Sequence, residues 1–258
     1  MLAGLAEAGI DLTSADLVVG TSAGSVVGAQ ILGGPTLEEL YAKQLEDATG
    51  EIAARMGISA MARFVLYSLW PGDAQRGRAR LGRASSRART VPESQRREVI
   101  GRRLPGTDWP ARALKITAVD AETGEARTFD RDSGVTLLDA VAASCAVPLV
   151  WPPITIGGRR YIDGGVRSVA NADLAIGCDR VVVLAPISFA IRRATSIANQ
   201  LVSLGANVRS VVVSPDAQAR KAIGNTSLDP ARRAASARAG RAQAPSVVDA
   251  VAKVWSTA

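Results

Sequence analysis

Apolar residues in this chain fall into two kinds of segment, short runs typical of strands and longer stretches with helical spacing. The short runs predict strands over residues 16–20, 114–120, 126–130, 154–156, 159–161, 180–184 and 208–213. Apolar side chains three and four positions apart predict helices over residues 2–9, 22–31, 36–47, 56–70, 136–145, 171–177 and 196–206. Because strand and helix alternate, we expect an α/β fold, a three-layer α/β/α sandwich with a mostly parallel central sheet.

Local signals mark where some of these elements begin and turn. Thr36 and Glu39 match the capping box of a helix start. Gly157 and Gly158 separate two short strand runs, which is typical of a tight hairpin turn. These signals predict a helix from residue 37 and a hairpin over residues 154–161.

We expect one domain over residues 1–258, because α/β folds of this length are commonly undivided. Its last part, residues 229–258, is rich in Ala and Arg and predicts helices at 229–242 and 246–255 that extend the same domain.

An Arg-rich stretch covers residues 75–103, with ten Arg against two acidic residues, Glu93 and Glu98. Its first part is predicted to be a mobile surface loop, and Pro92 followed by Glu93 can open a helix near its end. One interpretation is a flap that faces lipid headgroups. The alternative is a solvated loop that reflects only biased composition.

The composition excludes several mechanisms. The sequence contains no His, which rules out a Ser-His-Asp triad and His-ligated metal sites. Its two Cys, Cys145 and Cys178, cannot form a disulfide framework, and Cys145 lies in an apolar segment typical of a core thiol. No cofactor or metal is expected.

The net charge of +7 favours phosphate-bearing partners such as nucleic acid or an anionic lipid surface. No apolar run approaches the length of about 18 residues that a membrane span needs, and the first residues lack a signal-peptide pattern. We therefore expect a cytoplasmic location, with peripheral contact to anionic membranes. Nucleic-acid binding is not expected, because no groove-reading motif or aromatic platform accompanies the Arg residues.

The sequence Gly20-Thr21-Ser22-Ala23-Gly24 is a G-x-S-x-G motif between a predicted strand and a predicted helix. In this context the motif is typical of a nucleophilic serine on a sharp turn. The alternatives are a tight turn with an N-capping serine and a phosphate-binding loop. Thr21 and the nearby Ser25 are expected to cap or pack.

A nucleophilic serine needs a base within hydrogen-bond reach. Without His, that base must be a carboxylate or Lys, and the best candidate is Asp163 in Asp163-Gly164-Gly165. The alternative is an ordinary turn aspartate. Asp120 and Asp179 lie at strand ends without the glycine context.

Three ordered motifs together carry a resemblance to a known family. These are G-T-S-A-G at 20–24, A-S-C-A-V-P at 143–148 and D-G-G at 163–165. With K-I-T-A-V-D-A-E-T-G at 115–124 and N-A-D at 171–173, the chain resembles bacterial patatin-like phospholipases over roughly residues 2–215. The resemblance implies a patatin-like fold and a Ser22–Asp163 dyad that cleaves lipid acyl esters through an acyl-enzyme.

One element of the family pattern is absent. The family's oxyanion hole is a G-G-G-x-[RK]-G loop after its first strand, and no such run occurs in this sequence. We expect that the natural chain starts upstream of Met1, that residues 16–20 form an edge strand, and that Ala23 N–H is the remaining oxyanion donor. The competing hypothesis is a catalytically weak or silent family member that binds anionic lipid surfaces.

Overall fold

The computed structural model describes residues 1–47, 58–69, 72–190, 192–224 and 228–256. Its strands are β1 (Leu17–Gly20), β2 (Ala113–Asp120), β3 (Ala126–Phe129), β4 (Ile154–Ile156), β5 (Arg159–Asp163), β6 (Arg180–Leu184) and β7 (Arg209–Val213). Its α-helices are α1 (Leu2–Glu7), α2 (Ala23–Leu32), α3 (Leu37–Leu45), α4 (Ile58–Ser68), α5 (Ala74–Ser86), α6 (Glu93–Gly101), α7 (Leu137–Ser144), α8 (Ile197–Ser203), α9 (Ala217–Ile223), α10 (Arg233–Gln243) and α11 (Val248–Trp255).

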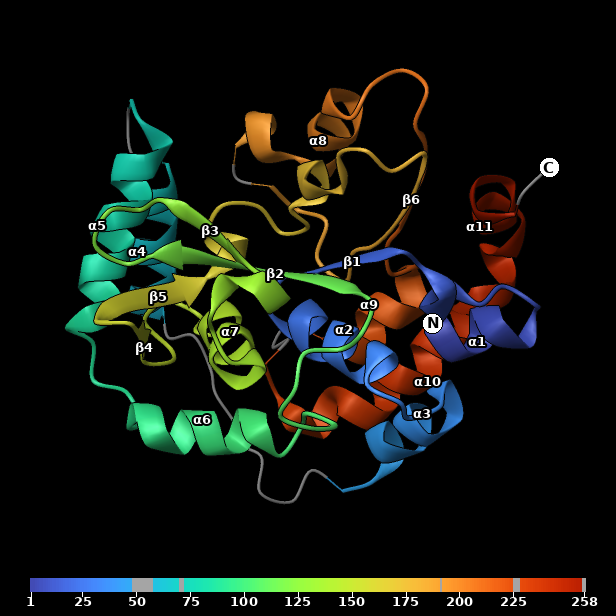
Figure 1. Cartoon of the computed structure of the whole chain (residues 1–258), viewed down its shortest axis with the longest axis horizontal. Helices are drawn as coiled ribbons and strands as arrows, with labels where there is room; N and C mark the ends of the chain where they lie inside the picture. The colour runs from blue at the N-terminus through green and yellow to red at the C-terminus, as the bar shows by residue number, and fades with distance from the viewer. Residues whose placement is uncertain (48–57, 70–71, 191, 225–227, 257–258) are drawn as a thin grey trace.

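The central sheet has the order β1-β2-β5-β4, with β3 also paired to β2 (Figure 1). Among the strands that the structure describes in this sheet, only β1 and β2 pair parallel, and β3, β4 and β5 pair antiparallel. The expected mostly parallel sheet is therefore wrong: the sheet is mixed. Two of the antiparallel pairings follow from short connections, because β2 with β3 and β4 with β5 are joined by turns too short for a parallel crossover. The third, β2 with β5, pairs segments that are distant in the chain.

The predicted hairpin is confirmed, since both Gly157 and Gly158 adopt positive φ (55° and 77°) between β4 and β5. A separate parallel pair, β6–β7, forms a second small sheet. Within the part of the chain that the structure describes, β1 is an edge strand, as its position in the sequence predicted.

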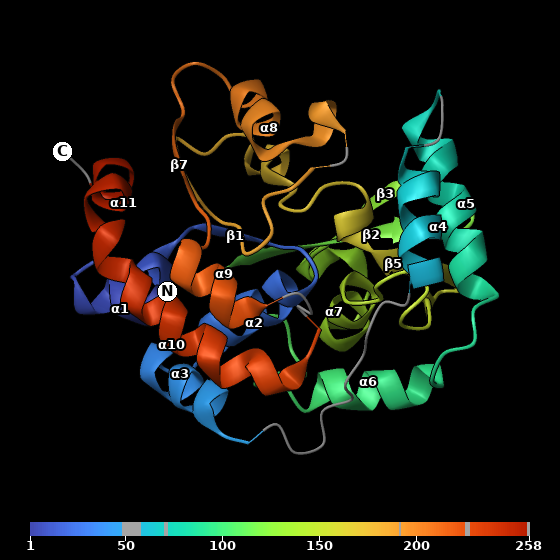
Figure 2. The ribbon, with the colours of Figure 1, turned by 180° about the vertical axis from the view of Figure 1, so that it is seen from behind.

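Helices cover both faces of the sheet and give the expected three-layer sandwich. Figure 1 shows α2 and α7 on one side, with α6 outside them, and α8 on the other. Seen from behind in Figure 2, α4 and α5 stand side by side at one end of the molecule. The main core lies between α2, α7 and the strands β2 and β5, where the rings of Phe129 and Tyr161 meet edge to face at 5.2 Å.

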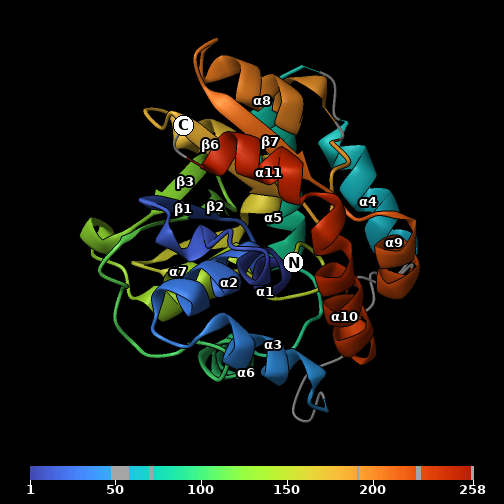
Figure 3. The same ribbon diagram turned by 90° about the vertical axis from the view of Figure 1, so that its right-hand side faces the viewer.

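The C-terminal helices pack against the beginning of the chain (Figure 3). α10 contacts α1, and α11 covers β6 and β7. The Trp255 indole donates a hydrogen bond to Asp11 O at 3.1 Å, and Arg180 Nη1 donates to Trp255 O at 2.6 Å. The end of the chain thereby shares one apolar cluster with α1, which includes Leu5 and Val251.

The Arg-rich segment differs from its prediction. Its first part is not a mobile loop but helix α5. Asp73 caps this helix by accepting a hydrogen bond from Gln75 N–H at 2.8 Å. Gly82 lies so close to the sheet that a Cβ there would sit 2.2 Å from Ala121 O. Arg is a good helix former, so one small, buried face is enough to order this basic segment.

Helices α3 and α6 begin where the sequence predicted, whereas helix α9 was not predicted. The capping box at Thr36 and Glu39 is present as predicted, and α6 begins at Glu93. Helix α9 was missed, because its start signal is the single N-cap residue Asp216, which accepts from Ala219 N–H at 2.7 Å.

Candidate active site

The G-x-S-x-G sequence forms the turn between β1 and α2. Ser22 adopts φ 53° and ψ −124°, a strained conformation for a residue with a side chain. Gly20 permits the turn, since a Cβ there would lie 2.5 Å from Ser25 Cα. Gly24 and Ala23 form the exposed first turn of α2, and a Cβ at Gly24 would meet nothing within 4 Å. The turn therefore requires glycine at position 20, whereas the structure shows no steric requirement at 24.

Buried polar groups hold Ser22 in this conformation. Its N–H donates to Ser144 Oγ at 2.9 Å, and Ser144 is the last residue of α7. Its carbonyl oxygen accepts from Ser25 N–H at 2.8 Å and from Ser25 Oγ at 2.6 Å. Ser25 thus supports the turn, in the packing and capping role predicted for it.

Asp163 lies at the end of β5 and is 5% exposed. Its Oδ1 accepts from Gly165 N–H at 2.7 Å. The Ser22 hydroxyl lies close enough to the carboxylate to lower its pKa. Gly164 is required here, because a Cβ would lie 2.2 Å from Thr117 Oγ1. The structure therefore brings the two predicted residues close to each other, the serine hydroxyl beside the buried carboxylate.

The environment of Asp163 sets its proton affinity. Burial raises the pKa of Asp163 to about 6, although the hydrogen bonds from Ser22 and Gly165 and the charge of Arg96 act in the opposite direction. The group is therefore ionised at neutral pH, yet close to the range in which a general base is most effective.

Comparison with known proteins bears on this pair of motifs. The family model described as patatin-like phospholipase matches residues 2–176, which include both motifs. The chain belongs to the patatin-like phospholipase family. No curated protein matches it in sequence. The family acts on lipid esters, so the chain carries the fold of a lipid acyl hydrolase.

A third residue connects the two turns of this patatin-like site. Asn171 is 1% exposed and adopts φ 49° just before the 3-10 turn Ala172–Ala175. Its Nδ2 donates to Thr21 Oγ1 at 3.0 Å and also lies 3.4 Å from Gly164 O. Its Oδ1 accepts from Arg167 at 2.7 Å. Asn171 therefore binds the loop of Ser22 to the loop of Asp163.

Thr117 on β2 belongs to the same network, since its hydroxyl lies 3.0 Å from that of Thr21 and 3.3 Å from Asn171 Nδ2. Sequence reasoning assigned no role to Thr117, Ser144 or Asn171. The sequence signal that could have identified these three residues was their position in the segments that carried the family resemblance. Thr21 packs into this network as predicted.

Of the other acidic candidates, Asp120 has a structural role for its carboxylate. Asp120 accepts from Glu122 N–H and Thr123 N–H, each at 2.9 Å, and forms an ion pair with Arg159 at 3.3 Å. Burial acts to raise the pKa of Asp120, but the hydrogen bonds from Thr123 and Glu122 outweigh it and leave that pKa below 3.8. Asp179 accepts from Arg209 N–H at 2.9 Å through its backbone carbonyl, beside β6.

The site also contains a buried thiol and a buried indole. Burial, together with the charge of Asp163, raises the pKa of Cys145 to about 11, so this thiol stays protonated at neutral pH. Trp151 is buried, with the Arg96 guanidinium 4.1 Å from its ring centroid. Both therefore contribute to the core around the dyad. Among the described residues no group of three or more His, Cys, Asp and Glu could hold a metal ion.

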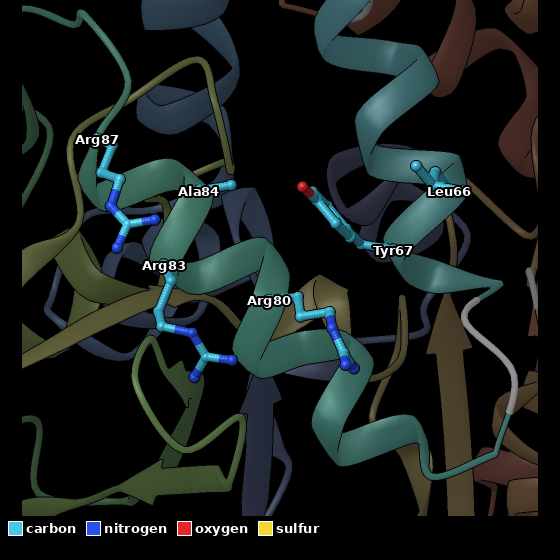
Figure 4. Close-up of a pocket in the computed structure, with 6 residues that line it drawn as sticks. All are labelled: Leu66, Tyr67, Arg80, Arg83, Ala84 and Arg87. Carbon is cyan, nitrogen blue, oxygen red and sulfur yellow. The ribbon is translucent and has the colours of Figure 1, made fainter.

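A hollow of about 420 Å³ lies apart from the dyad, between α4 and α5 (Figure 4). Its lining consists of Leu66, Tyr67, Arg80, Arg83, Ala84 and Arg87. No helix in the described ranges has the length and apolar character needed to cross a membrane.

Proposed function

We propose that this chain is a serine acyl-ester hydrolase that cleaves lipid esters with Ser22 as nucleophile and Asp163 as general base. The observation that carries the proposal is the placement of the Ser22 hydroxyl close enough to the buried Asp163 carboxylate to lower the pKa of that carboxyl. The strained Ser22 backbone supports it, since strain persists where the surrounding structure enforces it and is common at active sites.

In the proposed reaction Asp163 accepts the hydroxyl proton as Ser22 Oγ attacks the ester carbonyl carbon. The tetrahedral intermediate collapses, the departing alcohol takes the proton from Asp163, and the acyl group stays on Ser22. Water then attacks this acyl-enzyme while Asp163 accepts a proton from it. The second tetrahedral intermediate collapses, Asp163 returns the proton to the departing Ser22 Oγ, and the fatty acid leaves. The raised pKa of Asp163 suits both directions of proton transfer.

The developing oxyanion requires donors. Ala23 is the first residue of α2, where backbone N–H groups have no partner within the helix. We propose its N–H as one donor, aided by the positive end of the helix dipole. The glycine-rich loop that supplies these donors in the family pattern does not occur in the sequence.

The test combines labelling and turnover. A fluorophosphonate probe should label Ser22, identified by peptide mass spectrometry, and a panel of short- and long-chain esters should report hydrolysis. Labelling at another serine would refute the assignment of the nucleophile. Addition of an acceptor alcohol distinguishes hydrolysis from acyl transfer. Water and the alcohol react with the same acyl-enzyme, but water releases the fatty acid and the alcohol forms a new ester.

The second candidate function is a catalytically weak protein that binds anionic lipid surfaces. Two observations favour it: the missing glycine-rich loop and the basic hollow between α4 and α5. Vesicle binding without ester turnover or probe labelling would support this alternative over the hydrolase.

A further inference from the structure

Helices α4 and α5 present a basic groove on the surface of the molecule. Arg80 and Arg83 lie on α5, and Arg87 is its C-cap residue. They are three and four positions apart, so they share one face of that helix. Leu66 and Tyr67 of α4 form the opposite wall, and Figure 4 shows the Tyr67 hydroxyl pointing across toward α5. The buried face of α5, which includes Leu81 and Gly82, faces the other way, toward the sheet.

The groove is complementary in charge to phosphate. Among the described residues that line it there are three guanidinium groups and no carboxylate. The nearest acidic segment, at Glu122, offers its backbone carbonyl to Arg83 at 2.7 Å, while its carboxylate pairs with Arg160. Guanidinium groups recognise phosphate oxygens well, because their planar donors match the geometry of the anion.

Exposed apolar side chains lie next to these charges. Leu66 and Leu69 are 56% and 57% exposed, at and just beyond the end of α4. The loop after β6 is tied to the same helix end by Arg192 Nε, which donates to Ser68 O at 3.0 Å, and this loop exposes Phe189. Cations beside exposed aliphatic and aromatic groups are typical of surfaces that enter the headgroup region of a bilayer.

The groove stands at the end of the sheet that carries the dyad. β1 and β2 run parallel, and Ser22 follows the C-terminal end of β1. Gly82 of α5 packs against Ala121, directly after the C-terminal end of β2. A bilayer bound to α4 and α5 would therefore lie toward the end of the sheet that Ser22 follows.

We propose that the α4–α5 face binds anionic phospholipid bilayers, with Arg80, Arg83 and Arg87 against headgroup phosphates and Leu66 and Leu69 at the acyl boundary. This surface deepens the proposed function, because it delivers a lipid ester substrate to Ser22. Exposed aliphatic side chains favour lipid over nucleic acid, whose single strands are bound by aromatic platforms and a basic track.

The test measures binding of the purified chain to vesicles by flotation, using phosphatidylcholine alone and phosphatidylcholine with phosphatidylserine. The triple variant Arg80→Gln, Arg83→Gln, Arg87→Gln should lose binding to anionic vesicles on the order of 100-fold at low salt, since each basic residue at the surface strengthens binding several-fold. Leu66→Ser with Leu69→Ser should weaken binding to both vesicle types. The matched control, Arg209→Gln, Arg220→Gln, Lys221→Gln, removes the same charge from exposed positions elsewhere and should retain binding within about threefold.

Hydrolysis of a water-soluble short-chain ester separates this proposal from the proposed function. All three variants should hydrolyse that ester like the parent, and circular dichroism melts should show that they fold. If the parent does not hydrolyse it, the hydrolase proposal fails while the binding result stands. The docking proposal is overturned if the α5 triple variant binds anionic vesicles like the parent. It is also overturned if millimolar inorganic phosphate saturates the groove, or if an oligonucleotide binds there and vesicles do not.

Discussion

Replacement of Asp163 by Asn should stabilise the fold while abolishing activity. The carboxylate is buried, and its pKa is raised to about 6 from the ordinary 3.8. Asn has the same shape and keeps an oxygen that can accept from Gly165 N–H, but it stays neutral at every pH. Nδ2 of Asn faces the Ser22 hydroxyl, to which it can donate a hydrogen bond.

The size of this stabilisation follows from the difference between the pKa of Asp163 in the folded chain and its pKa in the unfolded chain. Between pH 3.8 and about 6 the unfolded chain has lost the Asp163 proton while the folded chain still holds it, so the parent loses stability as pH rises through this range. The shift of about 2 pH units corresponds to about 3 kcal/mol, at about 1.4 kcal/mol per unit. Asp163→Asn should therefore match the parent near pH 4 and exceed it by up to about 3 kcal/mol at pH 8.

Urea unfolding of parent and variant at pH 4, 6 and 8 measures this difference. Asp120→Asn is the matched control, because hydrogen bonds hold the pKa of Asp120 below 3.8 and its carboxylate stabilises the fold. That variant should be less stable than the parent at pH 8 by about 1 kcal/mol. A stability difference for Asp163→Asn that does not change with pH, or a loss at pH 8, would refute the reasoning.

The remaining predictions concern catalysis. Ser22→Ala and Asp163→Asn should each abolish ester hydrolysis, and the double variant should be no slower than either, because the pair acts as one unit; a much slower double variant would argue against the dyad. For the parent, kcat/KM should rise with pH through about 6 as Asp163 ionises, and a flat profile from pH 5 to 8 would exclude it as the base. Asn171→Gly, which suits the positive φ, should lower kcat on the order of 10- to 100-fold with KM nearly unchanged, since it releases both loops of the dyad; an unchanged kcat would mean that Asn171 serves stability alone. Residues 1–258 should turn over esters slowly, because loss of a single oxyanion donor typically costs on the order of 100- to 1000-fold in rate. Turnover that an added glycine-rich segment does not raise would assign the donors to groups within the chain, such as Ala23 N–H.

Much of this protein follows from its sequence alone. The strand, turn and helix around Ser22, the capping box at Thr36 and the hairpin at Gly157 were predictable, because each depends on residues that are neighbours in the chain. The absence of His by itself excludes an imidazole base, whatever the fold. The ordered motifs identified the family that the family model then matched.

Other features are decided by tertiary packing. Whether the Arg-rich segment is a loop or helix α5 depends on the small face that Gly82 packs against Ala121, which local composition does not reveal. The mixed sheet likewise depends on which strands pair across the chain. The proton affinity of Asp163 comes from burial, and burial is a property of the folded core.

Asn171, whose side-chain amide links the loop of Ser22 to the loop of Asp163, best illustrates the difference between what the sequence determines and what packing determines. Sequence places Ser22 and Asp163 in separate motifs, and neither motif says how the two loops are held together. The fold places one buried amide between Thr21 and Gly164, where unsatisfied polar groups would be costly. The catalytic residue types can be predicted from the sequence, because each motif consists of neighbouring residues. The distance between the two motifs cannot, because it is determined by the packing of segments that are distant in the chain.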